Sequence, residues 1–256
     1  MALYPNTLFH FTTKEGFLGI LENNFRLSYA LEKIRGPHTE KVIAIPMVSF
    51  CDLRLSELSR HIQSYGRYGI GLSKDWAERQ KLNPVFYVNP DAQVVGDAMW
   101  AIDKLNQAGL AKGREGEASE QLKLQGSVMN ILRFMKNYEG DLVREGKVKE
   151  QRFRFANERE WRFVPDVFHA EVLPFVRVTG DGTWNSEIKA KCNKLVAHLP
   201  LKFDPDDIKY LVVEQDEERL PLLPYLSAVT GKNYSEDEIK RLSTRILTSE
   251  QIETDM

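Results

Sequence analysis

The segment best equipped for chemistry runs from Asn157 to Val164 and places acids and bases beside apolar residues. Trp161–Val164 is typical of a buried strand, in which alternate side chains face opposite sides of the sheet. Glu158, Glu160 and Arg162 would then share one face. Carboxylates and a guanidinium at the end of an apolar strand lose hydration energy unless they are paired. The pattern therefore indicates either a structural ion-pair ladder or a charged functional site.

A histidine in the middle of a short apolar strand, His10 within Leu8–Thr12, is the second candidate for chemistry. Thr13 is suited to cap the helix that follows, so the start of the chain predicts a strand, a helix ending near Asn24 and a further strand at 25–29. In such a setting His10 fits either a core histidine with satisfied hydrogen bonds or a ligand-binding residue.

Glycines alternate with large residues in the third candidate segment, Tyr65–Ser73, which predicts a strand. Glycine weakens a strand, so this spacing is typical of a bulge or of a place where another group approaches the backbone closely. A twisted strand crossed by a neighbouring element would give the same pattern. The segment is neither a phosphate-binding loop nor a dinucleotide fingerprint, because no Gly-Lys-Ser and no suitably spaced helix follow it.

The elements that must position these residues alternate strands and helices. Residues 30–42 predict a loop with weak helical character, and the apolar run 42–51 predicts a central strand interrupted at Pro46. The other expected elements are helices at 52–65, 74–80, 217–227 and 235–252, strands at 84–88 and 206–213, and edge strands within 170–178. Residues 189–199 fit a helix and a strand equally well.

A helical insertion is expected from about 91 to 149, because two apolar stripes at helical spacing flank a polar connector at 109–119. Residues 135–138 and 146–149, in its last part, give a modestly basic approach to the segment around Glu160. Arg152 and Arg154 strengthen this approach.

Composition narrows the class of protein. The 256 residues are 42% hydrophobic and 28% charged with a net charge of −2, as in ordinary globular domains, and give no global footprint for nucleic acid or membrane. Two cysteines are too few for a disulfide framework or a metal cluster. We expect a cytoplasmic protein, since no signal peptide and no apolar run of the ~18 residues that span a bilayer is found.

Taken together, these segments resemble the AbiGi-type abortive phage resistance proteins, a family commonly labelled as antitoxins. The resemblance runs along most of the chain, including its last turn at 245–252. The segments that carry it are Leu8–Thr12 with Ile20-Leu21, Val48-Ser49-Phe50, Tyr65–Trp76 and Glu158–Arg162. More distantly, the order of motifs is similar to that of ADP-ribosyltransferases of the DarT and poly-ADP-ribosyl type.

The distant resemblance implies a fold and a set of roles. The fold would be α+β, with the split mixed or antiparallel sheets of the ADP-ribosyltransferases and a helical insertion, in a single domain over 1–256. His10, Phe11 and Thr12 would hold NAD, Tyr65 or Tyr68 would stack on nicotinamide, Glu160 would be catalytic and Glu158 would position the substrate. The motif tyrosine usually follows a glycine directly, and Gly66-Arg67-Tyr68 is offset by one residue, so both tyrosines stay open.

The chemistry suits these residue types. Cleavage of the nicotinamide–ribose bond passes through an oxocarbenium-like state, which a nearby carboxylate such as Glu160 stabilises. A flat aromatic side chain holds the nicotinamide ring, and a fixed histidine orients the ribose. NAD is the substrate in this mechanism, and no metal enters it.

Three functions follow as hypotheses. The first is an NAD-dependent ADP-ribosyltransferase acting as a toxin in phage defence, with a protein or nucleic acid as acceptor. The second is a non-catalytic antitoxin that holds a partner toxin. The third is a metal-dependent nuclease built on His10, His61, Glu158 and Glu160, whose spacing matches no familiar metal motif.

Glu160 separates the first two hypotheses. A catalytic Glu160 should be only partly paired with Arg162 and should lie at a cleft wall, so that Glu160→Gln changes stability by no more than about 1 kcal/mol while activity falls by orders of magnitude. In a structural ladder, breaking the buried pair should instead cost about 3–5 kcal/mol.

Overall fold

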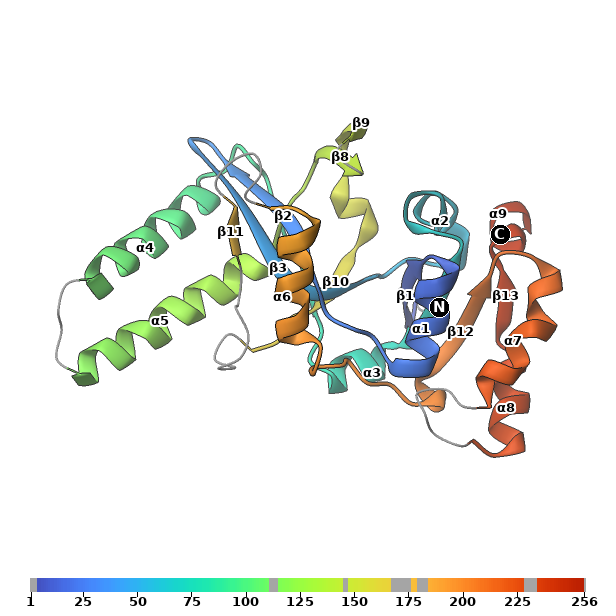
Figure 1. Ribbon diagram of the computed structural model, residues 1–256. Helices are drawn as coiled ribbons and strands as arrows, with labels where there is room; N and C mark the ends of the chain where they lie inside the picture. The colour runs from blue at the N-terminus through green and yellow to red at the C-terminus, as the bar shows by residue number, and fades with distance from the viewer. Residues whose placement is uncertain are drawn as a thin grey trace.

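The structure, a computed structural model, describes residues 4–110, 115–144, 147–166, 176–178, 184–227 and 234–255. A mixed sheet runs through the molecule, with strand order β13-β12-β4-β1-β3-β10-β5 and with β2 and β11 also paired to β3 (Figure 1). Its strands are β1 Thr7–Thr12, β2 Ser28–Gly36, β3 Thr39–Cys51, β4 Tyr68–Ser73, β5 Asn83–Pro84, β10 Glu160–Phe163, β11 Val176–Val178, β12 Ile208–Val213 and β13 Ile246–Thr248. All these pairs are antiparallel except β12–β13. The predicted α+β class is therefore confirmed.

The prediction of a loop at 30–42 is wrong, because these residues form β2 and the start of β3. The two strands pair from Ser28↔Met47 to Gly36↔Thr39, which leaves Pro37 and His38 as the turn. The Gly-Pro signal was thus correct for a turn, but the turn joins two strands. Lys33 and Arg35 of β2 are exposed, and these charged residues concealed the strand pattern.

Pro46 does not interrupt β3, which continues through it. On one edge of β3, β11 pairs as far as Ala44 and β10 pairs from Val48 onward. Among the described residues, Pro46 therefore has no paired strand on that edge, and the N–H that proline lacks is not needed for a described ladder there. A proline is tolerated in a strand at such a position, because it lacks this N–H.

Close approach to the glycines of β4 is confirmed. β1 pairs with β4 over its whole length, with Phe9 opposite Gly71 and Phe11 opposite Gly69. A Cβ added to Gly71 would lie 2.7 Å from the Phe9 ring, and one added to Gly69 would lie 2.8 Å from the Phe11 ring. The two glycines therefore make room for phenylalanine rings that lie across the strand.

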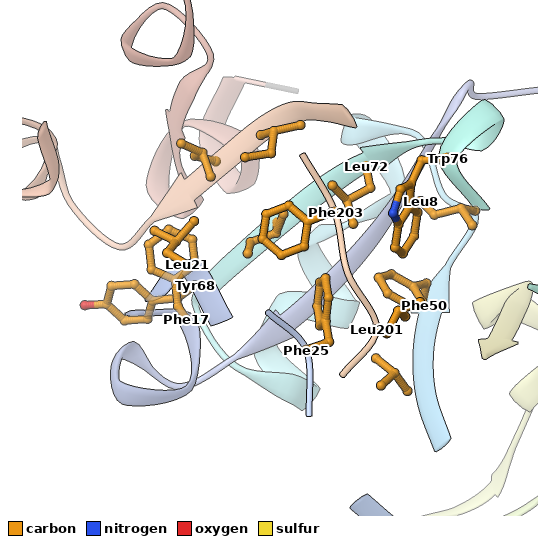
Figure 2. Packing of buried hydrophobic residues seen from close by; sticks show 14 of the residues in the cluster. Leu8, Phe17, Leu21, Phe25, Phe50, Tyr68, Leu72, Trp76, Leu201 and Phe203 are labelled. Carbon is orange, nitrogen blue, oxygen red and sulfur yellow. The ribbon is translucent and has the colours of Figure 1, made fainter. Parts of the chain in front are cut away.

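The largest core cluster covers one face of this sheet. Phe25 and Phe50 pack against the fully buried Trp76, and Phe203 packs against Phe25 (Figure 2). The Trp76 indole N–H donates to the Lys202 carbonyl at 2.9 Å. Three of the helices around this core are α1 Lys14–Asn23, α3 Lys74–Arg79 and α6 Ser186–Val196. Thr13 caps α1 by accepting from Gly16 N, as the sequence predicts.

The expected helical insertion is only partly helical. Its helices α4 Gln93–Leu110 and α5 Glu115–Arg133 form a hairpin that projects beyond the β2–β3 strands (Figure 1). Both helices extend into the predicted connector, of which 111–114 lie outside the described residues. After α5 the insertion continues as strands. β7 Met135–Asn137 pairs in parallel with β6 Phe86–Val88, which lies within the strand predicted at 84–88, and β8 Gly140–Arg144 pairs with β9 Lys147–Phe153.

The C-terminal segment differs from the single helix predicted at 235–252. It consists of α8 Glu236–Ser243, the strand β13 and α9 Ser249–Asp255, after the earlier helix α7 Arg219–Leu226. The apolar residues Ile246 and Leu247 leave the helix because they add a parallel strand beside Leu211 and Val212 of β12. Tertiary pairing outweighs local helix preference here.

Candidate functional site

Glu160 and Arg162 occupy β10, as expected, and Glu158 does not. β10 pairs with β3, so that Glu160 lies opposite Cys51 and Arg162 opposite Ser49. Glu158 ends the short 3-10 helix η2 Phe155–Glu158, and the next residue, Arg159, takes the left-handed conformation with φ 45°. The prediction that Glu158 shares a strand face with Glu160 is wrong, because the chain turns sharply between them.

A buried ion-pair network nevertheless unites the two acids. The Lys136 ammonium lies 2.6 Å from Glu160 Oε2 and 2.9 Å from Glu158 Oε2. Glu160 Oε1 accepts from Arg162 Nε at 2.5 Å and from the Ser49 hydroxyl at 2.7 Å. Glu160 is only 5% exposed. Both of its carboxylate oxygens are therefore engaged.

Arg162 extends the network to two other segments. Its guanidinium is 0% exposed, pairs with Glu32 Oε1 at 2.6 Å and donates to the Arg133 carbonyl at 3.1 Å. At the other end of the network, the Tyr65 hydroxyl donates to Glu158 Oε1. We call these residues the buried charge network: Glu32, Ser49, Tyr65, Lys136, Glu158, Glu160 and Arg162.

The electrostatics of this network favour its charged form. Although burial opposes ionisation, Arg162 and Lys136 hold the pKa of Glu160 well below its usual range. The pKa of Lys136 is raised well above its usual value, since Glu160 and Glu158 outweigh the desolvation that lowers it. Burial raises the pKa of Glu32, against the attraction of Arg162. An isolated charge at this depth would be costly, so each member depends on its partners.

A cleft of about 350 Å³ opens beside the network. Glu158 and Tyr65 reach its wall, and Glu160 does not. His61 stacks on Tyr65 in this wall, with ring centroids 4.3 Å apart and planes 26° from parallel. The remaining lining residues are Leu53, Glu57, Arg60, Ser64, Phe153, Ala156, Asn157 and Arg159.

His10 lies on the opposite face of the sheet. Phe9 is in register with Cys51, which is in register with Glu160, so these three share a face and His10 points to the other. Its Nδ1 lies 2.8 Å from the Ser49 carbonyl, and its ring packs against Phe25 and Phe50. Burial lowers the pKa of His10, which is the behaviour of a core histidine.

The two tyrosines left open by the sequence have different surroundings. Tyr68 follows His10 to the opposite face, where its hydroxyl lies 2.8 Å and 3.0 Å from the Glu218 carboxylate oxygens, and Figure 2 shows that hydroxyl directed away from the cluster. Tyr65 ends α2 Ser59–Tyr65 and joins the acids. Phe11 is buried against His61, and the Thr12 backbone lies against Gly66. The structure thus groups Tyr65 with Glu158 and Glu160, but not with His10 or Tyr68.

The geometry does not fit the nuclease hypothesis. Among the described residues, no group of three His, Cys, Asp or Glu side chains is placed to hold a metal ion. The carboxylates of Glu158 and Glu160 are already bound by Lys136, and Glu160 by Arg162 as well.

Several members of the network were not predicted. Lys136 arrives through the parallel β6–β7 pair, inside a segment expected to be helical. Glu32 lies on β2, which was expected to be a loop. Tyr87 is a further contact, because its hydroxyl accepts from the Glu160 backbone N–H at 2.8 Å. The one signal in the sequence is that two carboxylates are predicted to share a face with a single guanidinium, that of Arg162.

The fold and this network define a mixed α+β protein with a helical hairpin, built around a buried cluster of charges. The family model described as "Putative abortive phage resistance protein AbiGi, antitoxin" matches residues 23–214. The chain belongs to this AbiGi family, as the sequence resemblance predicts. An abortive phage resistance protein AbiGi from Lactococcus lactis subsp. cremoris is 28% identical over 225 residues, which cover 82% of this chain and 88% of that protein.

No solved structure matches the chain. In the described part of the chain, no helix has the length and apolar character needed to cross a membrane.

His61→Phe is expected to make stability less dependent on pH. Burial lowers the pKa of His61 from 6.5 to about 4. Because the unfolded chain takes up this proton first, the stability due to neutral His61 is present above pH 6.5 and is lost as the pH falls toward 4. Between pH 7 and pH 5 this loss should be about 1–2 kcal/mol, after allowance for partial exposure.

Urea unfolding of wild type and variant at the two pH values measures the effect. Phenylalanine keeps the aromatic contact with Tyr65 but cannot take up a proton. Gln63→Ala, at an exposed position of the same helix, removes no titratable group; it serves as control and should leave the pH dependence unchanged. An equal loss of stability between pH 7 and pH 5 in His61→Phe and wild type would show that His61 does not cause the pH dependence.

Proposed function

We propose that the chain acts in abortive phage resistance as an antitoxin that binds a partner toxin and has no catalytic role of its own. The family description supports the antitoxin role. The observation that carries the non-catalytic part is the state of Glu160, whose two carboxylate oxygens are occupied by Arg162, Lys136 and Ser49. A carboxylate engaged in this way has no free oxygen to meet a charge that develops on a substrate.

Co-expression with the product of the adjacent gene tests this proposal. The neighbour alone should arrest growth, the present chain should restore it, and the two proteins should co-elute in size-exclusion chromatography. Glu160→Gln should rescue growth as wild type does, at equal levels of folded protein. Growth arrest by the present chain alone, in the absence of its neighbour, would contradict the proposal.

A second candidate function is the NAD-dependent ADP-ribosyltransferase with the split-sheet fold of that class. One observation favours it: Tyr65 and Glu158 line a cleft, with His61 stacked on the tyrosine and Glu160 behind them. On this geometry Tyr65 would be the stacking tyrosine, and Glu158 would be the acid that reaches the ligand.

Calorimetry with NAD, followed by transfer of label from NAD to protein or nucleic acid in phage-infected lysate, tests the second candidate. Glu158→Gln should then abolish transfer more completely than Glu160→Gln, because only Glu158 lines the cleft. Absence of both NAD binding and label transfer in the wild type would exclude this function.

A further inference from the structure

The β8–β9 hairpin carries a local excess of positive charge that the whole chain, with a net charge of −2, does not show. Lys147, Lys149 and Arg152 of β9 are exposed, as is Arg154 just beyond its end. Arg154 lies over the ring of Tyr138, 5.4 Å from its centroid, and Tyr138 is itself 40% exposed. Basic residues interleaved with accessible aromatic rings are typical of surfaces that bind nucleic-acid backbones and bases.

This basic strand is continuous with the cleft. Arg60 of α2 lines the cleft, pairs with Glu150 of β9 at 2.5 Å and lies 5.1 Å from the centroid of the Phe153 ring. Figure 1 shows α2 and the β8–β9 hairpin on the same side of the sheet. Phe153, the last residue of β9, is part of the cleft wall. The hairpin and the mouth of the cleft therefore meet at the Arg60–Glu150 ion pair, and a second exposed ion pair joins Arg152 to Glu139 at 3.4 Å.

The two arginines at the cleft are available to an anion. Arg60 and Arg159 are paired with Glu150 and Glu57, but their side chains are 61% and 46% exposed. Exposed pairs of this kind contribute little to stability and are weakened by salt. A phosphate can therefore compete for either guanidinium at little cost.

The interior of the cleft suits a flat, polar ring. The His61 and Tyr65 rings form one stack, and the lowered pKa of His61 leaves it neutral at pH 7. Within the described part of the chain, no hydrogen bond reaches its ring nitrogens. Ser64 and Asn157 add hydroxyl and amide groups to the wall. A volume of about 350 Å³ accommodates a nucleobase with its sugar.

We propose that β9 and the cleft together bind single-stranded nucleic acid, with phosphates along Lys147, Lys149 and Arg152 and one base inserted beside His61. A base in a duplex is stacked and paired, so it cannot enter the cleft, and single strands are the form that fits. This binding depends neither on a partner toxin nor on NAD.

Fluorescence anisotropy with the full chain tests the proposal. The labelled probes are a 12-nucleotide uridine RNA, a 12-nucleotide thymidine DNA and a 12-base-pair duplex. Binding is measured at 50–200 mM salt, roughly the range in which phosphate contacts are lost. Either single strand, or both, should bind about tenfold more tightly than the duplex, and the two single-strand arms distinguish RNA from DNA. Binding should weaken steeply with salt.

Two variants separate the two halves of the site. The hairpin variant is Lys147→Gln/Lys149→Gln/Arg152→Gln. It should weaken binding to every sequence and reduce the slope of log affinity against log salt concentration by about 2, because each lost phosphate contact contributes about 0.7 to this slope for a single strand. His61→Ala should weaken binding about tenfold with an unchanged slope, because it removes stacking and no charge.

The matched control is Lys189→Gln/Lys191→Gln/Lys194→Gln on α6, which removes the same charge from exposed positions outside the cleft. It should bind as wild type does, and thermal melts establish that each variant is folded. The proposal would be overturned if the chain did not bind at 50 mM salt, where contacts to about three phosphates still hold. Equal affinity for duplex and single strands would also overturn it. So would an equal loss of affinity in the hairpin variant and in the α6 variant.

Discussion

Arg162→Met is expected to lower the free energy of unfolding by about 3–5 kcal/mol, because it removes the cation shared by two buried carboxylates. Methionine approximates the length of the side chain but cannot pair with Glu160 or Glu32, which lie 2.5 Å and 2.6 Å from the guanidinium. It also leaves the Arg133 carbonyl without this donor. Lys136 then remains alone against three acids, Glu32, Glu158 and Glu160.

Urea unfolding at pH 7 measures this loss. A neutral triple variant, Arg162→Met/Glu160→Gln/Glu32→Gln, should recover most of the stability, since removing the unpaired charges removes the penalty. Arg159→Met, at a side chain 46% exposed and paired with Glu57, is the control and should change stability by less than about 1 kcal/mol. A small effect of Arg162→Met alone would show that water reaches the network and screens it.

Gly66→Ala should cost about 3 kcal/mol or more, because it combines backbone strain with a steric clash. Gly66 ends α2 with φ 130° and ψ 163°, a conformation that side chains with a Cβ rarely adopt. A Cβ at this position would lie 2.2 Å from the Thr12 carbonyl oxygen. Strand β1 or the end of α2 would have to shift, and Tyr65 would move away from Glu158.

Gly19→Ala is the matched control for this substitution. Gly19 lies inside α1, and a Cβ there would meet nothing within 4 Å. Alanine should therefore raise stability by up to about 1 kcal/mol through helix propensity. Thermal melts of both variants measure the change in stability. Equal changes in Gly66→Ala and Gly19→Ala would mean that the backbone at Gly66 can accommodate a Cβ without strain.

The sequence predicted the elements whose signals are local. Thr13 marked the start of α1, and the glycines of β4 marked the close approach of Phe9 and Phe11. Pro46 misled, because its local signal is that of a strand breaker. Among the described strands it lies between the part of β3 that pairs with β11 and the part that pairs with β10, two strands that are remote in sequence.

Only the part of the site that lies within one short segment was predicted from the sequence. The acids and Arg162 share one short segment, so an ion-pair cluster could be anticipated from their spacing. Lys136 and Glu32 come from other strands, and only tertiary structure shows that they complete the cluster. With Lys136 in place, Glu160 is more fully paired than a catalytic residue was expected to be.

β3 also sets an order for folding. Its pairing with β2 is a local hairpin, of the kind that forms within about 1–10 μs. Its bond from Ser49 to Glu160 joins residues 111 positions apart. At a synthesis rate of about 5–20 residues per second, Ser49 leaves the ribosome roughly 6–22 s before Glu160. Until then Glu32 lacks the guanidinium that pairs with it, and the buried charge network can close only when β10 brings Glu160 and Arg162 together.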